Sequence, residues 1–279
     1  MNEHSKNQNS LKQYCKVLTI AGSDSGGGAG IQADLKTFSA IGCYGMSVIT
    51  ALTAQNTQGV KAIHAVPPAF AVEQIEAVLS DIGADAIKIG MLYSTELIEA
   101  VAQALIKHGA RKIVLDPVMV AQSGDKLLQN DAIEAIKENL MPLADVVTPN
   151  LPEASVLCGR RLTRWSDIES AAETLAKHGS RSILIKGGHL KTDVSPDLLY
   201  LAAENRFVEL KAERVPSRNN HGTGCTLSSA IASYMARGSG IEEAVKKAKI
   251  FITEAIRAGA GYQLGRGHGP VHHFYRFWK

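Results

Sequence analysis

Short apolar runs alternate with amphipathic stretches along most of this 279-residue chain, and this alternation constrains its fold more than any other feature. The runs are rich in β-branched residues, and the stretches between them carry apolar residues at helical spacing. Expected strands cover 16–21, 44–54, 60–66, 85–89, 112–115, 146–147 and 182–185; expected helices cover 31–41, a segment from Pro68, 94–107, 131–140 and 166–178. The pattern predicts a three-layer α/β fold, in which helices cover both faces of a mostly parallel sheet.

The later part of the chain departs from this alternation. Residues 200–203 and 207–211 are separated by a short polar turn, which predicts an antiparallel hairpin at one edge of the sheet. Two helices, at 224–237 and 241–259, follow. Because no repeat, linker or change of composition interrupts the pattern, we expect a single domain over 16–279, preceded by a disordered polar tail over 1–15.

Composition narrows the class of protein. Thirty basic and 27 acidic residues give a net charge of +3 without a dense basic block, which argues against nucleic-acid binding. No apolar run approaches the roughly 20 residues that span a bilayer, so we expect no membrane partner. The polar first 14 residues lack the apolar core of a signal peptide. Four cysteines without paired spacing fit a reduced, cytoplasmic protein.

The segment 221–226, His-Gly-Thr-Gly-Cys-Thr, leads directly into an expected helix. Such a turn directs unpaired backbone N–H groups and the positive end of the helix dipole at one point, which favours a bound phosphate. The candidate residues are Gly222, Thr223, Gly224 and Cys225. The alternative is an ordinary loop before a buried cysteine. A hydrolase pair of His221 with Cys225 lacks a visible orienting residue.

A glycine-rich loop at 22–30 follows the first expected strand. It reads GSDSGGGAG, which matches neither the dinucleotide fingerprint nor the GxxxxGK[ST] loop of nucleotidases. The glycines would let a small ligand approach the backbone closely, unless the segment is simply a flexible surface loop. Other polar residues also follow expected strands, at 55–56, 90–91, 116–117, 150 and 186–188, and ligands of such sheets bind at the carboxyl ends of the strands.

Three oxygen-bearing side chains, Asp116, Asn150 and Glu153, could hold Mg²⁺ with the help of substrate phosphates. The same Asn-to-Glu spacing is also an ordinary helix cap. Lys186 ends an apolar strand, where a cation needs an anionic partner, and we expect that partner to be a phosphate. The alternative is a surface lysine whose charged end reaches the solvent. His272 and His273 show no metal-ligand spacing, and a zinc site is not expected.

Taken together, these segments resemble the hydroxymethylpyrimidine/phosphomethylpyrimidine kinases of thiamine biosynthesis, within the ribokinase-like superfamily. The resemblance extends over nearly all of 16–278. Its blocks lie at 18–24, 27–36, 88–92, 148–154, 186–190, 221–226 and 269–274. It implies a ribokinase-like fold, with ATP and Mg²⁺ as cofactors. The implied activity converts 4-amino-5-hydroxymethyl-2-methylpyrimidine to its monophosphate and then to its diphosphate.

The resemblance also implies roles for individual residues. The pyrimidine pocket would be lined by Gly22, Asp34, Gln55, Met91 and Val118. Cys225 would stand where the wider superfamily has an aspartate base, with its thiol pKa lowered by the helix terminus, and 222–225 would form the anion hole. Lys186 and Lys249 would contact phosphates, together with Thr223 and Gly224, and Asn150 with Glu153 would organise Mg²⁺. Gly26 departs from the expected serine, and some family members carry Glu in place of Gln55.

Hydrogen-bond polarity supports Gln55 independently, because a carboxamide complements the donor and acceptor edge of a 4-aminopyrimidine. A pyridoxal kinase on the same scaffold is the main alternative, and its substrate presents a phenolic oxygen instead. A non-catalytic nucleotide- or vitamin-binding protein and a cysteine hydrolase are less well supported. The polar segment 121–126 is expected to be a lid, and an edge hairpin permits a homodimer.

Overall fold

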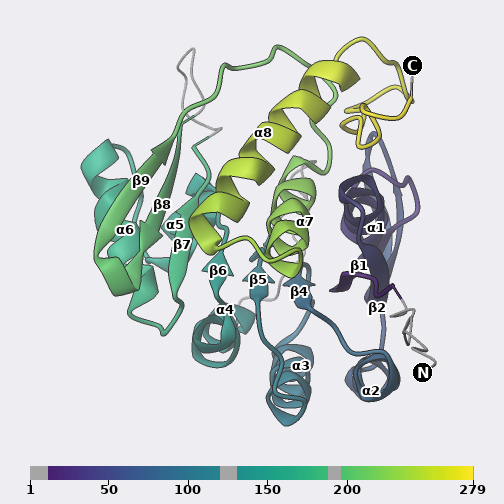
Figure 1. Ribbon diagram of the computed structural model, residues 1–279, viewed down its shortest axis with the longest axis vertical. Helices are drawn as coiled ribbons and strands as arrows, with labels where there is room; N and C mark the ends of the chain where they lie inside the picture. Colours follow the sequence, from purple (N-terminus) through teal and green to yellow (C-terminus); the bar gives the residue numbers. More distant parts are fainter. Residues whose placement is uncertain (1–11, 120–130, 188–195, 279) are drawn as a thin grey trace, which may run out of the picture.

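The computed structural model describes residues 12–119, 131–187 and 196–278, which form a central sheet between two helical layers (Figure 1). Within these residues, the strand order is β3-β2-β1-β4-β5-β6-β7-β8-β9. The strands are β1 (Lys16–Asp24), β2 (Tyr44–Asn56), β3 (Gly59–Ala65), β4 (Ala86–Ile89), β5 (Ile113–Leu115), β6 (Val146–Val147), β7 (Ser182–Ile185), β8 (Asp197–Leu201) and β9 (Arg206–Leu210). The helices are α1 (Gly30–Ile41), α2 (Pro68–Asp81), α3 (Thr95–Lys107), α4 (Ala132–Ala135), α5 (Leu151–Leu157), α6 (Trp165–Ala176), α7 (Thr223–Ala236) and α8 (Ile241–Gly259).

The two faces of the sheet are covered by different helices, as the predicted three-layer fold requires (Figure 1). Along β5, Ile113 and Leu115 pack in the core beneath α2, α3 and α6, whereas Val114 packs with α1, α7 and α8. This alternation follows the two-residue period of a strand. The interior strands are therefore apolar on both sides, which confirms the mostly parallel, helix-covered sheet.

Both edges of the sheet are antiparallel, whereas the sequence predicted only one such edge. β3 pairs antiparallel with β2, and β8 pairs antiparallel with both β7 and β9. The predicted hairpin is present, but its first strand is Asp197–Leu201 rather than 200–203. Residues 202–204 form a 3₁₀ turn that ends at Asn205 in a left-handed conformation, so they cannot continue the strand.

The helix predicted over 131–140 is also different. The α-helical part is only Ala132–Ala135, and a π-helical turn over Ile136–Leu140 and a 3₁₀ turn over Met141–Leu143 follow it. Pro142 lies in that last turn, where its ring prevents regular α-helical bonding. In the part of the chain that the structure describes, no helix combines the length and apolar character needed to cross a membrane.

One ion pair lies entirely inside the molecule, between Lys88 of β4 and Asp34 of α1. The Lys88 Nζ to Asp34 Oδ2 distance is 2.9 Å, and neither side chain is exposed. Thr19 of β1 also donates to Asp34 Oδ2 at 2.6 Å, and Ser229 of α7 donates to Asp34 Oδ1 at 2.6 Å. Burial alone would lower the pKa of Lys88, but the Asp34 carboxylate, together with Cys225 and Asp116, outweighs burial and raises it. The pair joins two strands to two helices.

We expect Lys88→Met to lower the free energy of unfolding by about 3–5 kcal/mol, because it leaves the Asp34 carboxylate buried without its cation. Urea unfolding measures this loss. The matched control, Lys107→Met, removes the exposed lysine that pairs with Glu76 and should change stability little. The double variant Lys88→Met/Asp34→Leu should recover most of the loss, and a double variant as unstable as the single one would contradict this account.

Candidate active site

The glycine loop and the turn before α7 pack against each other through their backbones. Gly222 is the N-cap of α7 with φ of +77°, and a Cβ at this position would overlap the carbonyl oxygen of Gly28. A Cβ at Gly28 would in turn overlap the ring of His221. Only glycine allows this close approach. The loop is therefore one wall of the site rather than a loose surface segment.

Asp24 holds the glycine loop in shape. Its Oδ1 accepts a hydrogen bond from the Gly26 N–H at 2.8 Å, and its Oδ2 accepts from the N–H groups of Gly28 and Ala29 at 3.0 and 2.8 Å. His221 Nε2 lies 2.9 Å from the same Oδ2. Burial would raise the pKa of Asp24, but these hydrogen bonds, that of His221 first, lower it below its ordinary value. Asp24 thus connects the loop to the turn.

A lysine and two carboxylates meet at the carboxyl ends of β5, β6 and β7. Lys186 Nζ lies 2.8 Å from Asp116 Oδ1 and 3.9 Å from Glu153 Oε2. The Thr148 hydroxyl donates to Asp116 Oδ1 at 3.0 Å. The sequence predicted a phosphate as the partner of Lys186; in the structure the protein itself supplies the anion.

Burial affects the two carboxyl groups differently. It raises the pKa of Glu153 to about 7, an effect that Lys186 opposes and Asp116 reinforces. Burial would also raise the pKa of Asp116, but Lys186 and then Lys88 outweigh it, so the pKa of Asp116 lies below its ordinary value. The cluster therefore holds one firmly ionised carboxylate and one carboxyl that titrates near neutral pH.

The first turn of α7 lies directly against this cluster. A Cβ at Gly224 would stand 3.4 Å from Lys186 Nζ and 3.6 Å from Asp116 Oδ2. One turn further along α7, the Ser228 hydroxyl lies 3.4 Å from Asp116 Oδ2. The fold thus brings the predicted anion-binding turn, Lys186 and Asp116 to one place, although they are far apart in the sequence.

Asn150 and Glu153 form a reciprocal helix cap, which was the alternative interpretation of their spacing. Asn150 Oδ1 accepts from the Glu153 N–H at 2.9 Å, and Glu153 Oε2 accepts from the Asn150 N–H at 2.8 Å, at the start of α5. Among residues 12–119, 131–187 and 196–278, no group of three or more His, Cys, Asp or Glu could hold a metal ion. A complete protein-built metal site, as distinct from one shared with phosphate, is therefore absent there.

Cys225 corrects one expectation. The helix terminus was expected to lower its thiol pKa, but burial raises that pKa to about 11. The negative charges of Asp34 and Asp116 add to the effect of burial, while Lys88 and the Gly30 N–H oppose it. Burial and the two carboxylates therefore outweigh Lys88 and the Gly30 N–H, and the thiol is neutral at physiological pH.

The predicted ring-pocket residues divide into two groups. Gly22 faces Met91, since a Cβ at Gly22 would come within 2.7 Å of the Met91 Cε, and Met91 clusters with Ala51, Ile63 and Val118. Asp34 was expected in the same wall but is fully buried, with its oxygens bonded to Thr19, Lys88 and Ser229. In this structure Asp34 lies in the core, where it connects the elements that form the site instead of lining the pocket.

Gln55, predicted to line the ring pocket, lies beside the predicted anion-binding turn. Its Nε2 lies 3.3 Å from His221 Nε2, and its Oε1 accepts from the Thr53 hydroxyl at 3.1 Å. His221 therefore contacts Gln55 and Asp24, and these contacts do not support the hydrolase alternative, in which it would serve Cys225.

Three further expectations concern residues farther from the cluster. Lys249, expected at nucleotide phosphates, pairs with Asp197 at 2.7 Å, and Asp197 also accepts from the Gly187 N–H at the end of β7. His273 is a core residue whose Nε2 lies 3.0 Å from the Thr226 hydroxyl, and burial lowers its pKa to about 3. The expected lid at 121–126 lies outside the described residues.

Sequence reasoning assigned no role to Asp24 or Lys88, and it did not consider His221 as a link between motifs. A signal for Asp24 was available, because an aspartate before a run of glycines commonly bonds the backbone N–H groups that follow it. Lys88 was also visible as the single cation in an apolar strand. The partners of both, however, are distant in sequence.

The chain is similar to proteins of known family and structure. The model of the phosphomethylpyrimidine kinase family matches residues 24–272. A hydroxymethylpyrimidine/phosphomethylpyrimidine kinase of Rhizobium meliloti is 52% identical, over 94% of this chain and 98% of its own length. The thiamine biosynthesis bifunctional protein ThiED of Geobacter sulfurreducens is 54% identical, over 92% of this chain, which spans about half (52%) of that longer protein.

Solved structures show the same architecture. A phosphomethylpyrimidine kinase of Clostridium difficile is 48% identical with a TM-score of 0.77, over 86% of this chain and 99% of that one. A Bacillus subtilis pyridoxal kinase in complex with ADP is 36% identical with a TM-score of 0.87, over 95% of this chain and 100% of that one. The sheet and the glycine-walled site are those of a ribokinase-like kinase fold. Within it, the chain belongs to the phosphomethylpyrimidine kinase family.

The raised pKa of Glu153 predicts a pH dependence of stability. Between its ordinary value of 4.5 and about 7, the unfolded chain releases the proton and the folded chain retains it, so Glu153 contributes a fall in the free energy of unfolding as pH rises. Buried His273 contributes a rise up to its ordinary pKa, and it does so equally in wild type and variant. Glu153→Gln keeps a capping side chain but cannot titrate. Between pH 4.5 and 7.5, urea unfolding should therefore show a more negative change in the free energy of unfolding for the wild type than for the variant. Equal changes in both proteins would contradict the assignment.

Proposed function

We propose that this protein transfers phosphate from ATP to the hydroxymethyl group of 4-amino-5-hydroxymethyl-2-methylpyrimidine, and then to the resulting monophosphate. The observation that carries the proposal is the contact of the glycine turn of α7 with the Lys186–Asp116 pair, beside Gln55. An anion-binding turn next to a cation suits a phosphoryl group. The name of the Rhizobium meliloti relative states both kinase activities. The AMP-PCP and ADP complexes of related pyridoxal kinases support ATP as the donor.

The chain's own groups divide the work of transfer. The N–H groups at the start of α7 bind and orient the phosphate, in a transition state for which positioning and charge stabilisation matter most. Lys186, held by Asp116, supplies positive charge beside them. Cys225 is a neutral thiol and cannot accept a proton, so it orients the acceptor alcohol by a hydrogen bond, and the alcohol's proton passes to a phosphate oxygen as the new oxygen–phosphorus bond forms and ADP leaves.

Mg²⁺ fits this site only as an ion shared with the substrate. Asp116 and Glu153 are hard oxygen donors that approach one lysine, and the cap uses only Oε2 of Glu153. Two carboxylates leave most of the coordination to phosphate oxygens and water, as is usual for Mg²⁺. When bound, the ion would neutralise phosphate charge, with Asp116 and Glu153 as its protein ligands.

Gln55 favours the aminopyrimidine over pyridoxal, the substrate of the second candidate function. Its carboxamide offers an acceptor and a donor to the aminopyrimidine edge, and its contacts with Thr53 and His221 hold it beside the ring pocket. The second candidate has a specific basis, since pyridoxal kinases share the fold at 36–38% identity.

A competition experiment separates these functions. With ATP, Mg²⁺, the hydroxymethylpyrimidine and pyridoxal in one reaction, mass-resolved analysis should show pyrimidine products with one and then two phosphates. Gln55→Leu should reduce the preference for the pyrimidine by roughly 5- to 150-fold, the cost of an unmet polar group of about 1–3 kcal/mol. Phosphorylation of pyridoxal alone would establish the second candidate. No ATP turnover with either alcohol would indicate a non-catalytic binding protein.

Variants of the α7 turn test whether the backbone N–H groups or the Cys225 thiol contribute more to kcat. Gly224→Val places a side chain between the N–H groups and Lys186, and we expect kcat to fall by at least about 10²–10³-fold. Cys225→Ala should lower kcat by less than the valine variant does, because a neutral thiol orients the alcohol but does not remove its proton. Gly224→Ala is the folding control, because its Cβ meets only ordinary contacts. A valine variant much more active than Cys225→Ala would reverse the assigned order.

A further inference from the structure

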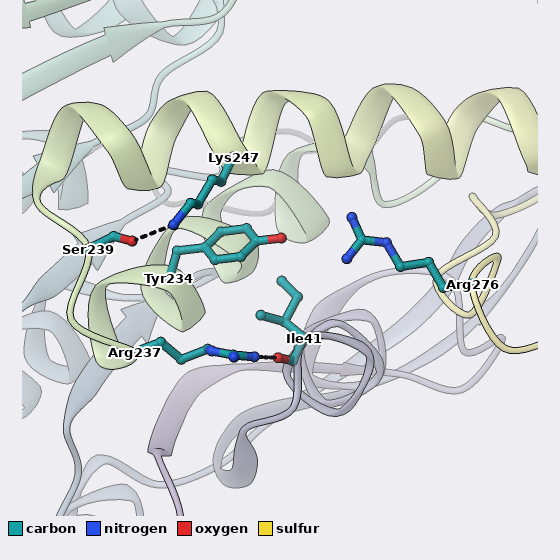
Figure 2. A pocket seen from close by; sticks show the side chains of 6 residues that line it. All are labelled: Ile41, Tyr234, Arg237, Ser239, Lys247 and Arg276. Atoms are coloured by element: carbon teal, nitrogen blue, oxygen red, sulfur yellow. Dashed lines mark hydrogen bonds between the residues drawn. The ribbon is translucent and has the colours of Figure 1, made fainter.

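A second basic site lies at the far end of α7 from the phosphate turn. The structure has a cavity of about 310 Å³ here. Figure 2 shows the residues that line it: Ile41, Tyr234, Arg237, Ser239, Lys247 and Arg276. α7 has 14 residues, so its two ends are about 20 Å apart. The cavity is therefore separate from the site described above, and neither the proposed reaction nor the comparisons assign it a role.

Three cations converge on this cavity from separate segments. Arg237 follows the end of α7, Lys247 lies on α8, and Arg276 belongs to the C-terminal segment (Figure 2). Like charges brought together in this way repel one another. The negative end of the α7 dipole compensates them only partly. A fold that gathers three cations around one space favours an anion within it.

The contacts of these cations leave most of their charge uncompensated. Arg237 donates to the Ile41 carbonyl, and Arg276 donates to the Tyr275 hydroxyl at 3.0 Å and lies over the Phe251 ring. Within the described ranges, neither arginine has a carboxylate at ion-pair distance. Lys247 pairs with Glu243 at 2.8 Å, and all three cations are exposed to solvent.

Hydroxyl groups complete the lining. Ser239 accepts a hydrogen bond from Lys247 at 3.1 Å and can donate its own proton, and Tyr234 presents a phenol below the lysine, whose Nζ lies 5.8 Å from the ring centre. Arginine forks and hydroxyl donors match an anion with many acceptor oxygens. Three cations against one paired glutamate leave a net charge of about +2, which suits a phosphate group better than a single carboxylate, and the cavity of about 310 Å³ has room for two linked phosphates.

We propose that this cavity binds a diphosphate group, either free or at the end of a small ester. The proposal does not depend on the assigned kinase activity. The rigid helix α7 runs from this cavity to the phosphate turn, so a diphosphate bound here would contact the same element that holds the transferred group.

Calorimetric titration with inorganic diphosphate at about 0.15 M salt, where weak surface attraction is largely screened, tests the proposal. We expect one bound diphosphate per chain, beyond any held at the α7 turn, that the double variant Lys247→Gln/Arg276→Gln binds at least about tenfold more weakly. Lys246→Gln is the matched control, since Lys246 is the next residue on α8 and pairs with Glu242 outside this cavity. It should bind as the wild type does.

Two further measurements show whether the ligand is a free anion or an ester, and whether the double variant is still folded. Equal binding of methyl diphosphate indicates an ester whose organic part points outward, whereas binding of inorganic diphosphate alone indicates the free anion. The double variant should keep the wild-type kinase rate and unfolding midpoint, because neither residue belongs to the site at the opposite end of α7. Wild-type protein that binds no diphosphate here, or a double variant with unchanged affinity and stoichiometry, would overturn the proposal.

Discussion

The buried pair of Asp34 and Lys88 is the interaction on which the site depends most. It joins α1, β4, β1 and α7 within the core, and Cys225 at the start of α7 is sensitive to the charge of both residues. Burying two charges is costly unless each is paired and hydrogen-bonded, and here both conditions are met. The pair therefore fixes the position of α7 relative to the sheet from inside the protein.

A second pair, Asp116 with Lys186, repeats this design nearer the surface. The two pairs are electrostatically linked, since Lys88 contributes to the low pKa of Asp116. Between them, the Cys225 thiol experiences two carboxylates as well as a lysine, which together with burial keeps it neutral. The site thus concentrates charge while holding its sulfur uncharged. This combination suits phosphate binding better than thiolate chemistry, because a phosphate would be repelled by a thiolate.

Glycines bring the two phosphate-facing segments together. Gly222 and Gly28 allow the turn and the loop to pack backbone against backbone, and Asp24 with His221 fastens that contact through side chains. Polar N–H groups are then held in place before a ligand arrives, which is the arrangement that electrostatic catalysis requires. The same close packing places Gln55 beside the turn, within 3.3 Å of His221.

The sequence alone determined the layered α/β fold, the glycine segments and the family, because these depend on local periodicity and on short contiguous motifs. It also placed the polar residues at strand ends. Only the tertiary structure decided which anion Lys186 meets, that Asp34 is buried beneath the site, and that burial raises the pKa of Cys225. Each of these depends on groups far apart in the chain. Their burial and separation follow from packing, and no local pattern encodes them.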